Sequence, residues 1–414
     1  MTIDEHPSDQ PAIAGGTPVR AQDNFLVFGA PVLGEAEETA VLACLRSRWI
    51  GQGQRVLEFE QKFARYTGAP YAVAVNSATA ALNLALLAFG VGPGDEVLVP
   101  TMTFCSTVNS IVHTGAQPVL VDCDPRTFLI DPDQIEARIT PRTKALVVVH
   151  MCGRCCAMDR IMELARKHNL RVIEDCAHAI ESRYQGIPAG RWGDAGCFSF
   201  YATKNVTTGD GGMVITSSRR WAKRIKLLSL HGMTSDAWHR TTAPRAGYDV
   251  LYPGYKCNMT DLEASLGLVQ LQYVEERAVR RAQLWDFYQR NLEGLPLVLP
   301  PAVEEGTRHA FHLYSVLLQL EQLRIGRAEL MQGLRAEGIG SGVHYVPVHM
   351  LRYYRCQFGF RPSDFPHAKF VGERTLSLPL TASMEIGDAA DVCRAIGRLL
   401  RYHFVKATNR ASRD

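Results

Sequence analysis

The chain has 414 residues, with 45 lysines and arginines against 42 aspartates and glutamates, which gives a net charge of +3. Charges of both signs are interspersed, which argues against a nucleic-acid-binding surface, and no apolar run reaches the roughly 20 residues that span a bilayer. The N-terminal residues are polar and lack the basic start and apolar stretch of a signal peptide. We therefore expect an enzyme-sized globular chain in the cytoplasm, without a nucleic-acid or membrane partner.

The eleven cysteines are odd in number and lie in apolar contexts, which favours free thiols over a disulfide framework. Cys152 and Cys155 have the spacing of a zinc-ligand pair, and Cys156 and His150 are close in sequence. No second pair with this spacing exists, so a loop after a buried strand is the favoured interpretation and no metal is expected.

Short apolar runs alternate with helical stretches between residues 70 and 220. Five runs have the composition of buried strands, namely Tyr71–Asn76, Glu96–Pro100, Gln117–Asp122, Ala145–His150 and Arg171–Asp175. Helical spacing is found at Ala78–Leu87, Phe104–Thr114 and Asp159–His168. This alternation predicts an α/β fold with a mainly parallel sheet, whose ligands bind at the carboxyl ends of the strands.

Two further strands are expected at Cys197–Phe200 and Met213–Thr216, with a glycine-rich turn at Gly209–Gly212 between them. A long amphipathic helix over Leu262–Leu292 is expected to lead into a second domain. That domain is expected to contain a strand at Tyr314–Leu320, a helix at Arg327–Glu337 and a final helix at Ala389–Tyr402.

These patterns divide the chain into four parts. We expect a flexible segment over residues 1–24, a large domain over 25–275, a small C-terminal domain over 276–406 and a flexible tail over 407–414.

Two groups of residues at expected strand ends could bind charged partners. Asn76-Ser77-Ala78-Thr79 stands between a strand and a helix, where small residues let backbone N–H groups approach an anion. Asp175 ends a buried run, and an ionised carboxylate there needs a cation such as a protonated pyridine nitrogen. Taken alone, Ser77 and Asp175 are each better explained as an ordinary helix cap.

A third group is Ser199-Phe200-Tyr201-Ala202-Thr203-Lys204-Asn205, which leads into Gly209-Asp210-Gly211-Gly212. A lysine in a tight turn between strands is withdrawn from water, which lowers its pKa and favours the neutral, nucleophilic amine. Most lysines are surface charges. The order of the three groups, an anion cradle, a buried acid and then a lysine, nevertheless indicates one site.

Together these motifs resemble the signature of the DegT/DnrJ/EryC1/StrS aminotransferases, over about Phe25 to Leu400. The resemblance implies an enzyme that depends on pyridoxal 5'-phosphate (PLP) and has fold type I, that of aspartate aminotransferase. It also implies a large domain with a mainly parallel mixed sheet and a smaller C-terminal α+β domain. The segments Leu230–Met233, Pro253–Asp261 and Gly340–Tyr345 are most similar to those of UDP-4-amino-4-deoxy-L-arabinose aminotransferases.

The resemblance also implies catalytic and cofactor-binding roles. Lys204 would form the aldimine with PLP and move the proton, and Asp175 would pair with the pyridinium nitrogen. The remaining cofactor contacts would come from Ser77, Ala78, Thr79 and Ser199 at the phosphate, Phe104 stacked on the ring and His178 near the ring hydroxyl.

Four more residues are implied in contacts beyond the subunit's own cofactor. Asn258 would reach the phosphate of the neighbouring subunit's PLP, so that a homodimer shares its active sites. Lys256, His344 and Tyr345 would face the sugar nucleotide.

The implied reaction moves an amino group from L-glutamate to a nucleotide-linked keto sugar, with a 4-keto sugar expected, by a ping-pong mechanism. A PLP-dependent sugar dehydratase is an alternative, although dehydrating relatives carry histidine where this chain has Lys204. A non-catalytic regulatory relative is another, against which stands the retention of Lys204, Asp175 and Ser199 together. No G-x-G-x-x-G or P-loop motif supports a nucleotide-dependent oxidoreductase or NTPase.

Overall fold

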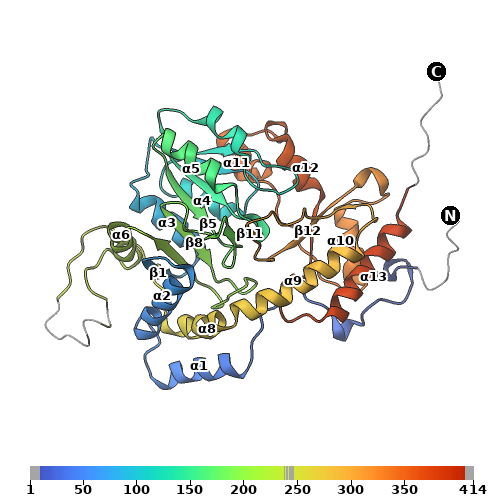
Figure 1. Cartoon of the computed structure of the whole chain (residues 1–414), viewed down its shortest axis with the longest axis horizontal. Coiled ribbons are helices and arrows are strands. Elements are labelled where there is room, and N and C mark those ends of the chain that lie inside the picture. Colours follow the sequence, from blue (N-terminus) through green and yellow to red (C-terminus); the bar gives the residue numbers. More distant parts are fainter. Residues whose placement is uncertain (1–9, 237, 239–240, 242–246, 406–414) are drawn as a thin grey trace.

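The computed structural model describes residues 10–236, 238, 241 and 247–405, and its centre is a seven-stranded sheet (Figure 1). The strands lie in the order β1 (Tyr71–Val75), β9 (Gly212–Thr216), β8 (Ala195–Ser199), β5 (Arg171–Asp175), β4 (Thr143–Val149), β2 (Glu96–Pro100) and β3 (Gln117–Val121). β9 is antiparallel to both of its neighbours, and the other neighbouring pairs are parallel. The expected mainly parallel mixed sheet is confirmed.

Helices cover both faces of the sheet. Successive strand residues point to opposite faces, and apolar side chains on each face are buried against helices. Val214 of β9 enters a core with α3 (Ala78–Ala88), α4 (Cys105–Val112), α5 (Met158–Lys167) and α6 (Arg219–Ser229). Met213 and Ile215 enter a second core with α2 (Gln54–Thr67) and α8 (Asp261–Gln272), against which α1 (Glu35–Arg46) also packs. The predicted helices in this region are present, whereas α1, α2 and α6 were not foreseen.

The single helix expected over residues 262–292 is wrong. Two helices occupy this stretch, α8 and α9 (Val274–Asn291), and Tyr273 between them leaves the helical conformation with φ −100° and ψ 5°. α8 packs against α1 and α2, whereas α9 packs against the C-terminal helix α13 (Ile386–Tyr402). The break lets α8 and α9 take different directions, each along the helices on which it packs. Figure 1 shows α9 running away from α8 toward α13.

The C-terminal part builds its own core around a three-stranded antiparallel sheet of β10 (Leu297–Val298), β12 (Tyr314–Leu318) and β13 (Thr375–Leu378). Leucines and aromatic residues of α9, α10 (Arg327–Ala336) and α13 fill this core. The predicted strand near residue 314 and both predicted helices are present. The remaining elements of this part are β11 (Thr307–Arg308), η7 (Leu320–Gln322), η8 (Val348–Met350), α11 (Arg352–Phe358), η9 (Pro362–Asp364) and α12 (Pro366–Arg374).

Short elements complete the large sheet's surroundings. They are η4 (Pro132–Gln134), η5 (Glu136–Arg138), η6 (Met151–Gly153), and the strands β6 (Arg183–Tyr184) and β7 (Ile187–Pro188), which form a small sheet with β11. Among the helices of the described residues, none is both long enough and apolar enough to cross a membrane.

Residues 10–24, expected to belong to a flexible segment, contact the C-terminal part and include η2 (Ala12–Ala14) and η3 (Gln22–Asn24). The buried carboxylate of Glu337 accepts hydrogen bonds from the N–H groups of Ala12 at 2.8 Å and Val19 at 2.9 Å. Arg20 forms an ion pair with Asp388 of α13 at 2.6 Å. The expected flexibility of residues 1–9 and 407–414 lies outside the described residues.

Candidate active site

A cavity of about 400 Å³ opens where the parallel strands end. Ten of the twelve residues that the sequence singled out line it, namely Ser77, Ala78, Thr79, Phe104, Asp175, His178, Ser199, Lys204, His344 and Tyr345. Lys256 and Asn258 are not among the lining residues. The C-terminal part closes the other side of the cavity with residues that include His312 and Leu380.

One end of the cavity is the N-terminus of α3. Ser77 caps this helix by accepting a hydrogen bond from the Ala80 N–H at 3.1 Å, so the ordinary capping role is present. The N–H groups of the first helical residues, Ala78 and Thr79, have no acceptor within the helix and can serve an anion. A Cβ on Gly212 would lie 2.5 Å from the Ser77 carbonyl carbon, so glycine is needed for β9 to pass this turn. The cradle fits a phosphate group.

Asp175 lies at the end of β5, with 4% of its surface exposed. Its carboxylate accepts hydrogen bonds from the Thr107 hydroxyl at 2.8 Å and the Ala177 N–H at 3.1 Å. Burial raises the pKa of Asp175, although both donors and the nearby Lys204 act in the opposite direction. A turn rather than a helix follows the residue, so the helix-cap interpretation is wrong. A buried carboxylate facing a cavity is suited to hold a proton on a ring nitrogen.

Lys204 stands in the turn between β8 and β9. Its backbone N–H donates to the Tyr201 carbonyl at 2.9 Å, and Tyr201 pairs with Gly209 to close the loop. Burial lowers the pKa of the Lys204 amine to about 8, while Asp175 and Cys152 favour its charged form. The amine therefore deprotonates far more readily than that of a solvated lysine, which suits a nucleophile and base.

His178 and Tyr345 form a hydrogen-bonded pair on the cavity wall. The Cys152 N–H donates to Nδ1 of His178 at 3.3 Å, and Nε2 lies 3.1 Å from the Tyr345 hydroxyl. Burial lowers the pKa of His178 well below its ordinary value, so the ring is neutral. Phe104, with 53% of its surface exposed, has its ring centroid 5.5 Å from that of Tyr345 and remains available to a flat ligand.

His344 is held between two contacts. Its Nδ1 lies 2.8 Å from the Ser377 hydroxyl, and its ring stacks on Phe28 with centroids 5.3 Å apart. Burial lowers the pKa of His344 to about 4. Phe28 was not identified from the sequence, because only the tertiary fold brings the N-terminal segment to the cavity.

Lys256 and Asn258 lie outside the cavity but contact each other, with the Lys256 Nζ donating to the Asn258 Oδ1 at 2.6 Å. Asn258 pairs with Val75 at the end of β1, close in sequence to the α3 cradle. These two residues are thus placed near the site without entering this subunit's cavity.

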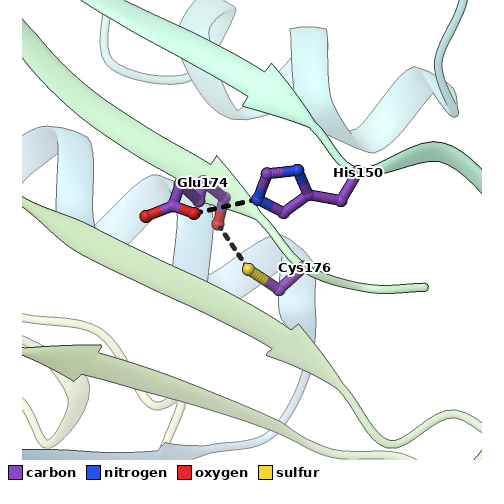
Figure 2. Close-up of side chains that lie close together, drawn as sticks. All are labelled: His150, Glu174 and Cys176. Carbon is purple, nitrogen blue, oxygen red and sulfur yellow. Dashed lines mark hydrogen bonds and ion pairs between the residues drawn. The ribbon is translucent and has the colours of Figure 1, made fainter. Parts of the chain in front are cut away.

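A buried cluster of His150, Glu174 and Cys176 has the spacing of possible metal ligands, with the candidate atoms within 4.8 Å of one another (Figure 2). The Glu174 carboxylate already accepts from the N–H groups of Gly190, Trp192 and Gly193 at 2.7–2.8 Å and contacts His150 Nε2 at 2.9 Å. The cluster therefore ties the loop before β8 to β5.

The cysteines agree with this structural role. All eleven are free thiols, as expected. Among the described residues, Cys152, Cys155 and Cys156 do not join His150 in any candidate ligand group, and the thiols of Cys152 and Cys156 hydrogen-bond to Ser315 and to the Val149 carbonyl.

Comparison with known proteins identifies the family. The model of the DegT/DnrJ/EryC1/StrS aminotransferase family matches residues 31–397. This chain belongs to that family. The spore coat polysaccharide biosynthesis protein SpsC of Bacillus subtilis (strain 168) is 45% identical over 385 residues, which are 92% of this chain and 99% of SpsC.

Solved structures agree with this assignment of family and fold. The PLP form of Spr1654 from Streptococcus pneumoniae is 34% identical, with a TM-score of 0.85 over 91% of this chain and 99% of that chain. Helicobacter pylori PseC, an aminotransferase involved in the biosynthesis of pseudoaminic acid, is 26% identical, with a TM-score of 0.85 over 91% of this chain and all of PseC.

The protein is accordingly a PLP-dependent sugar aminotransferase of fold type I. Spr1654 has been solved with PLP and with its aminated form, PMP. The cavity of this aminotransferase fits the same group, since it combines an anion cradle, a buried carboxylate and a lysine of lowered pKa.

Sequence reasoning missed His312. Its ring lies 4.5 Å from that of His178, and burial lowers its pKa well below the ordinary value. The stretch from His309 to Tyr314 carries two histidines directly before a predicted strand, and this was the available signal. Histidine spacing alone does not show which ring faces a cavity, which only the packing of the two parts decides.

Proposed function

We propose that this aminotransferase, as a cytoplasmic homodimer, transfers an amino group from L-glutamate to a nucleotide-linked keto sugar, with the keto group at carbon 4, by a ping-pong mechanism. The observation that carries the proposal is one cavity in which Lys204 and Asp175 face a wall of neutral imidazole and hydroxyl groups. Such a wall can pair with sugar hydroxyls. The SpsC and PseC names, which refer to polysaccharide and pseudoaminic acid biosynthesis, support a sugar acceptor.

The proposed roles of the residues follow from their positions. PLP, when bound, supplies a ring that withdraws electrons from the reacting carbon of the amino acid. Asp175 keeps a proton on the ring nitrogen, and the α3 N-terminus with Ser199 binds the phosphate. Phe104 orients the ring by stacking.

Lys204 carries the proton. Its amine has a pKa of about 8, so a substantial fraction is neutral near physiological pH and can take the proton from the donor's Cα. In the second half-reaction, the same Nζ gives a proton to the sugar carbon that receives the amino group. Because glutamate and the sugar both need Lys204, they occupy the cavity in turn, and ping-pong kinetics follow.

Asn258 is proposed to act across a dimer interface. It lies outside its own subunit's cavity, beside the end of β1 and joined to Lys256. A two-fold partner could bring its amide to the phosphate cradle, which would make each site depend on both subunits.

The proposal is tested by following the two half-reactions separately. Glutamate should remove the absorbance of the PLP form, and after glutamate is washed out a panel of nucleotide-linked 3-keto and 4-keto sugars is added. Return of the absorbance with a 4-keto sugar supports the proposal. If 2-oxoglutarate restores the absorbance and every keto sugar fails, the nucleotide-sugar acceptor is wrong. Intersecting rather than parallel double-reciprocal lines would contradict the ping-pong order.

A further inference from the structure

His312 lies on the cavity wall just before β12, in contact with the ring of His178. It is 6% exposed, and its centroid is 4.5 Å from that of His178. None of the cofactor roles above uses this side chain. A buried imidazole in the wall of this cavity offers one hydrogen-bond donor or acceptor, and its tautomer decides which.

The tautomer of His312 follows from Asn205, the residue after Lys204. The Asn205 Nδ2 donates to the Ala310 carbonyl at 3.0 Å and to the Glu181 carboxylate at 2.9 Å, both of which only accept. Its Oδ1 must therefore face His312, whose Nδ1 lies 2.9 Å away. An amide oxygen only accepts, so Nδ1 of His312 carries the proton.

The opposite nitrogen of His312 is consequently an acceptor. Burial, together with the charge of Lys204, keeps the ring neutral by lowering its pKa. Nε2 has a lone pair, and it lies on the side of the ring opposite the Asn205 contact. The orientation of the Asn205 amide, and with it that of His312, is held by Glu181. Glu181 forms a buried ion pair with Arg281 in which both side chains are at most 3% exposed.

Tyr345 has the complementary polarity. The Cys152 N–H occupies Nδ1 of His178, so the neutral His178 ring carries its proton on Nε2. That Nε2–H donates to the Tyr345 oxygen at 3.1 Å. The Tyr345 hydroxyl proton is then free to donate to a ligand, and burial raises the pKa of Tyr345, which keeps that proton in place.

We propose that His312 is a specificity-determining residue that accepts a hydrogen bond from a sugar hydroxyl on the carbon next to the keto carbon, while Tyr345 donates to the keto oxygen. A keto group beside a hydroxyl presents one acceptor and one donor. The keto oxygen matches the Tyr345 hydroxyl, which donates, and the sugar hydroxyl matches His312 Nε2, which accepts. The inference rests on the proposed function and narrows its substrate class to α-hydroxy ketones.

The first test uses the unmodified holoenzyme and two nucleotide-linked keto sugars that differ only in the neighbouring hydroxyl, which is replaced by hydrogen in one. In the sugar half-reaction, kcat/KM should fall by about a hundredfold or more for the deoxy sugar, since a site built to bind a hydroxyl is left unpaired. Equal kcat/KM values for the two sugars would overturn the inference. Failure of both sugars would instead overturn the proposed function.

The second test assigns the discrimination to His312. The His312→Phe variant should lose most of the preference for the hydroxylated sugar, measured as the ratio of the two kcat/KM values, while near-UV circular dichroism reports correct folding. His312→Gln, which keeps an acceptor near the position of Nε2, should restore part of the preference. His309→Phe makes the same change at a buried histidine that is not among the lining residues, and this variant should keep the full preference for the hydroxylated sugar. A full preference in His312→Phe would contradict the assignment.

Discussion

At the scale of single residues, desolvation gives Lys204 its reactivity. Its pKa of about 8 is set by burial against the opposing charge of Asp175. We predict that the rate at which apoenzyme binds PLP covalently rises with pH and reaches half of its plateau value near pH 8, because only the neutral amine attacks the cofactor's aldehyde. Stopped-flow absorbance measures this rate.

Two comparisons make the Lys204 prediction specific. A solvated lysine would place the half-maximal rate at about pH 10.4, which is the outcome that would contradict the lowered pKa. Lys204→Ala should abolish cofactor fixation by borohydride, whereas Lys167→Ala, a change at an exposed lysine on α5, should leave it intact.

Glu174 illustrates a residue whose role is structural. Its carboxylate accepts three backbone N–H groups and contacts His150 while it is fully buried. Glu174→Gln turns one acceptor into a donor that faces N–H groups, so we predict a loss of about 3 kcal/mol in the free energy of unfolding, measured by urea denaturation. Glu136→Gln, at a surface ion pair, should cost less than about 1 kcal/mol.

The same cluster supplies a metal test. If Glu174 serves only hydrogen bonds, a chelator should change neither the melting temperature nor the activity. A fall in either one that zinc reverses would show that His150, Glu174 and Cys176 hold a metal.

At the scale of elements, the meeting of β9 and α3 forms the anion cradle. We predict that Gly212→Ala raises the dissociation constant for PLP at least tenfold and lowers stability by about 1–3 kcal/mol, because the added Cβ would press against the backbone of Ser77. Equilibrium titration of apoenzyme measures the affinity. Gly387→Ala is the matched control, since its Cβ meets open space in α13, and unchanged PLP affinity in Gly212→Ala would show that the cradle does not bind the phosphate.

The elements also show where local patterns mislead. The apolar periodicity of residues 262–292 continues through Tyr273, and a window of sequence therefore indicates one helix. The break arises because α8 packs on α1 and α2 while α9 packs on α13, and neither partner is visible locally. The two-residue strands β6, β7, β10 and β11 were likewise missed, since two residues are too short to show a pattern, and β10 and β11 also pair with strands that are not their neighbours in the sequence.

At the scale of the whole molecule, the proposed shared site predicts complementation. Lys204→Ala and Asn258→Ala should each be nearly inactive alone. Co-refolded in equal amounts, they should recover about a quarter of the unmodified activity, because half of the dimers are mixed and each mixed dimer has one complete site. An assay after refolding, with each variant refolded alone as control, measures the recovery. Full activity of Asn258→Ala alone would contradict the shared site.

The sequence by itself determined which segments form the strands of the large sheet and the order in which the anion cradle, the buried acid and the lysine follow them. Buried strands show as apolar runs, such as those expected to end at Asp175 and Phe200, and the residue that follows such a run must lie at a strand end. For that reason the amino-acid pattern alone is enough to place the cradle, the acid and the lysine at one edge of the sheet.

Only the tertiary structure decided what faces these residues across the cavity. His312, Phe28 and Leu380 reach it because the C-terminal part and the N-terminal segment pack over the strand ends. Hydrogen-bond partners far apart in sequence act on these rings, since Asn205 sets the tautomer of His312 and Ser377 orients His344. Local sequence records which side chains are available, whereas the polarity that each presents depends on contacts made after the chain has folded.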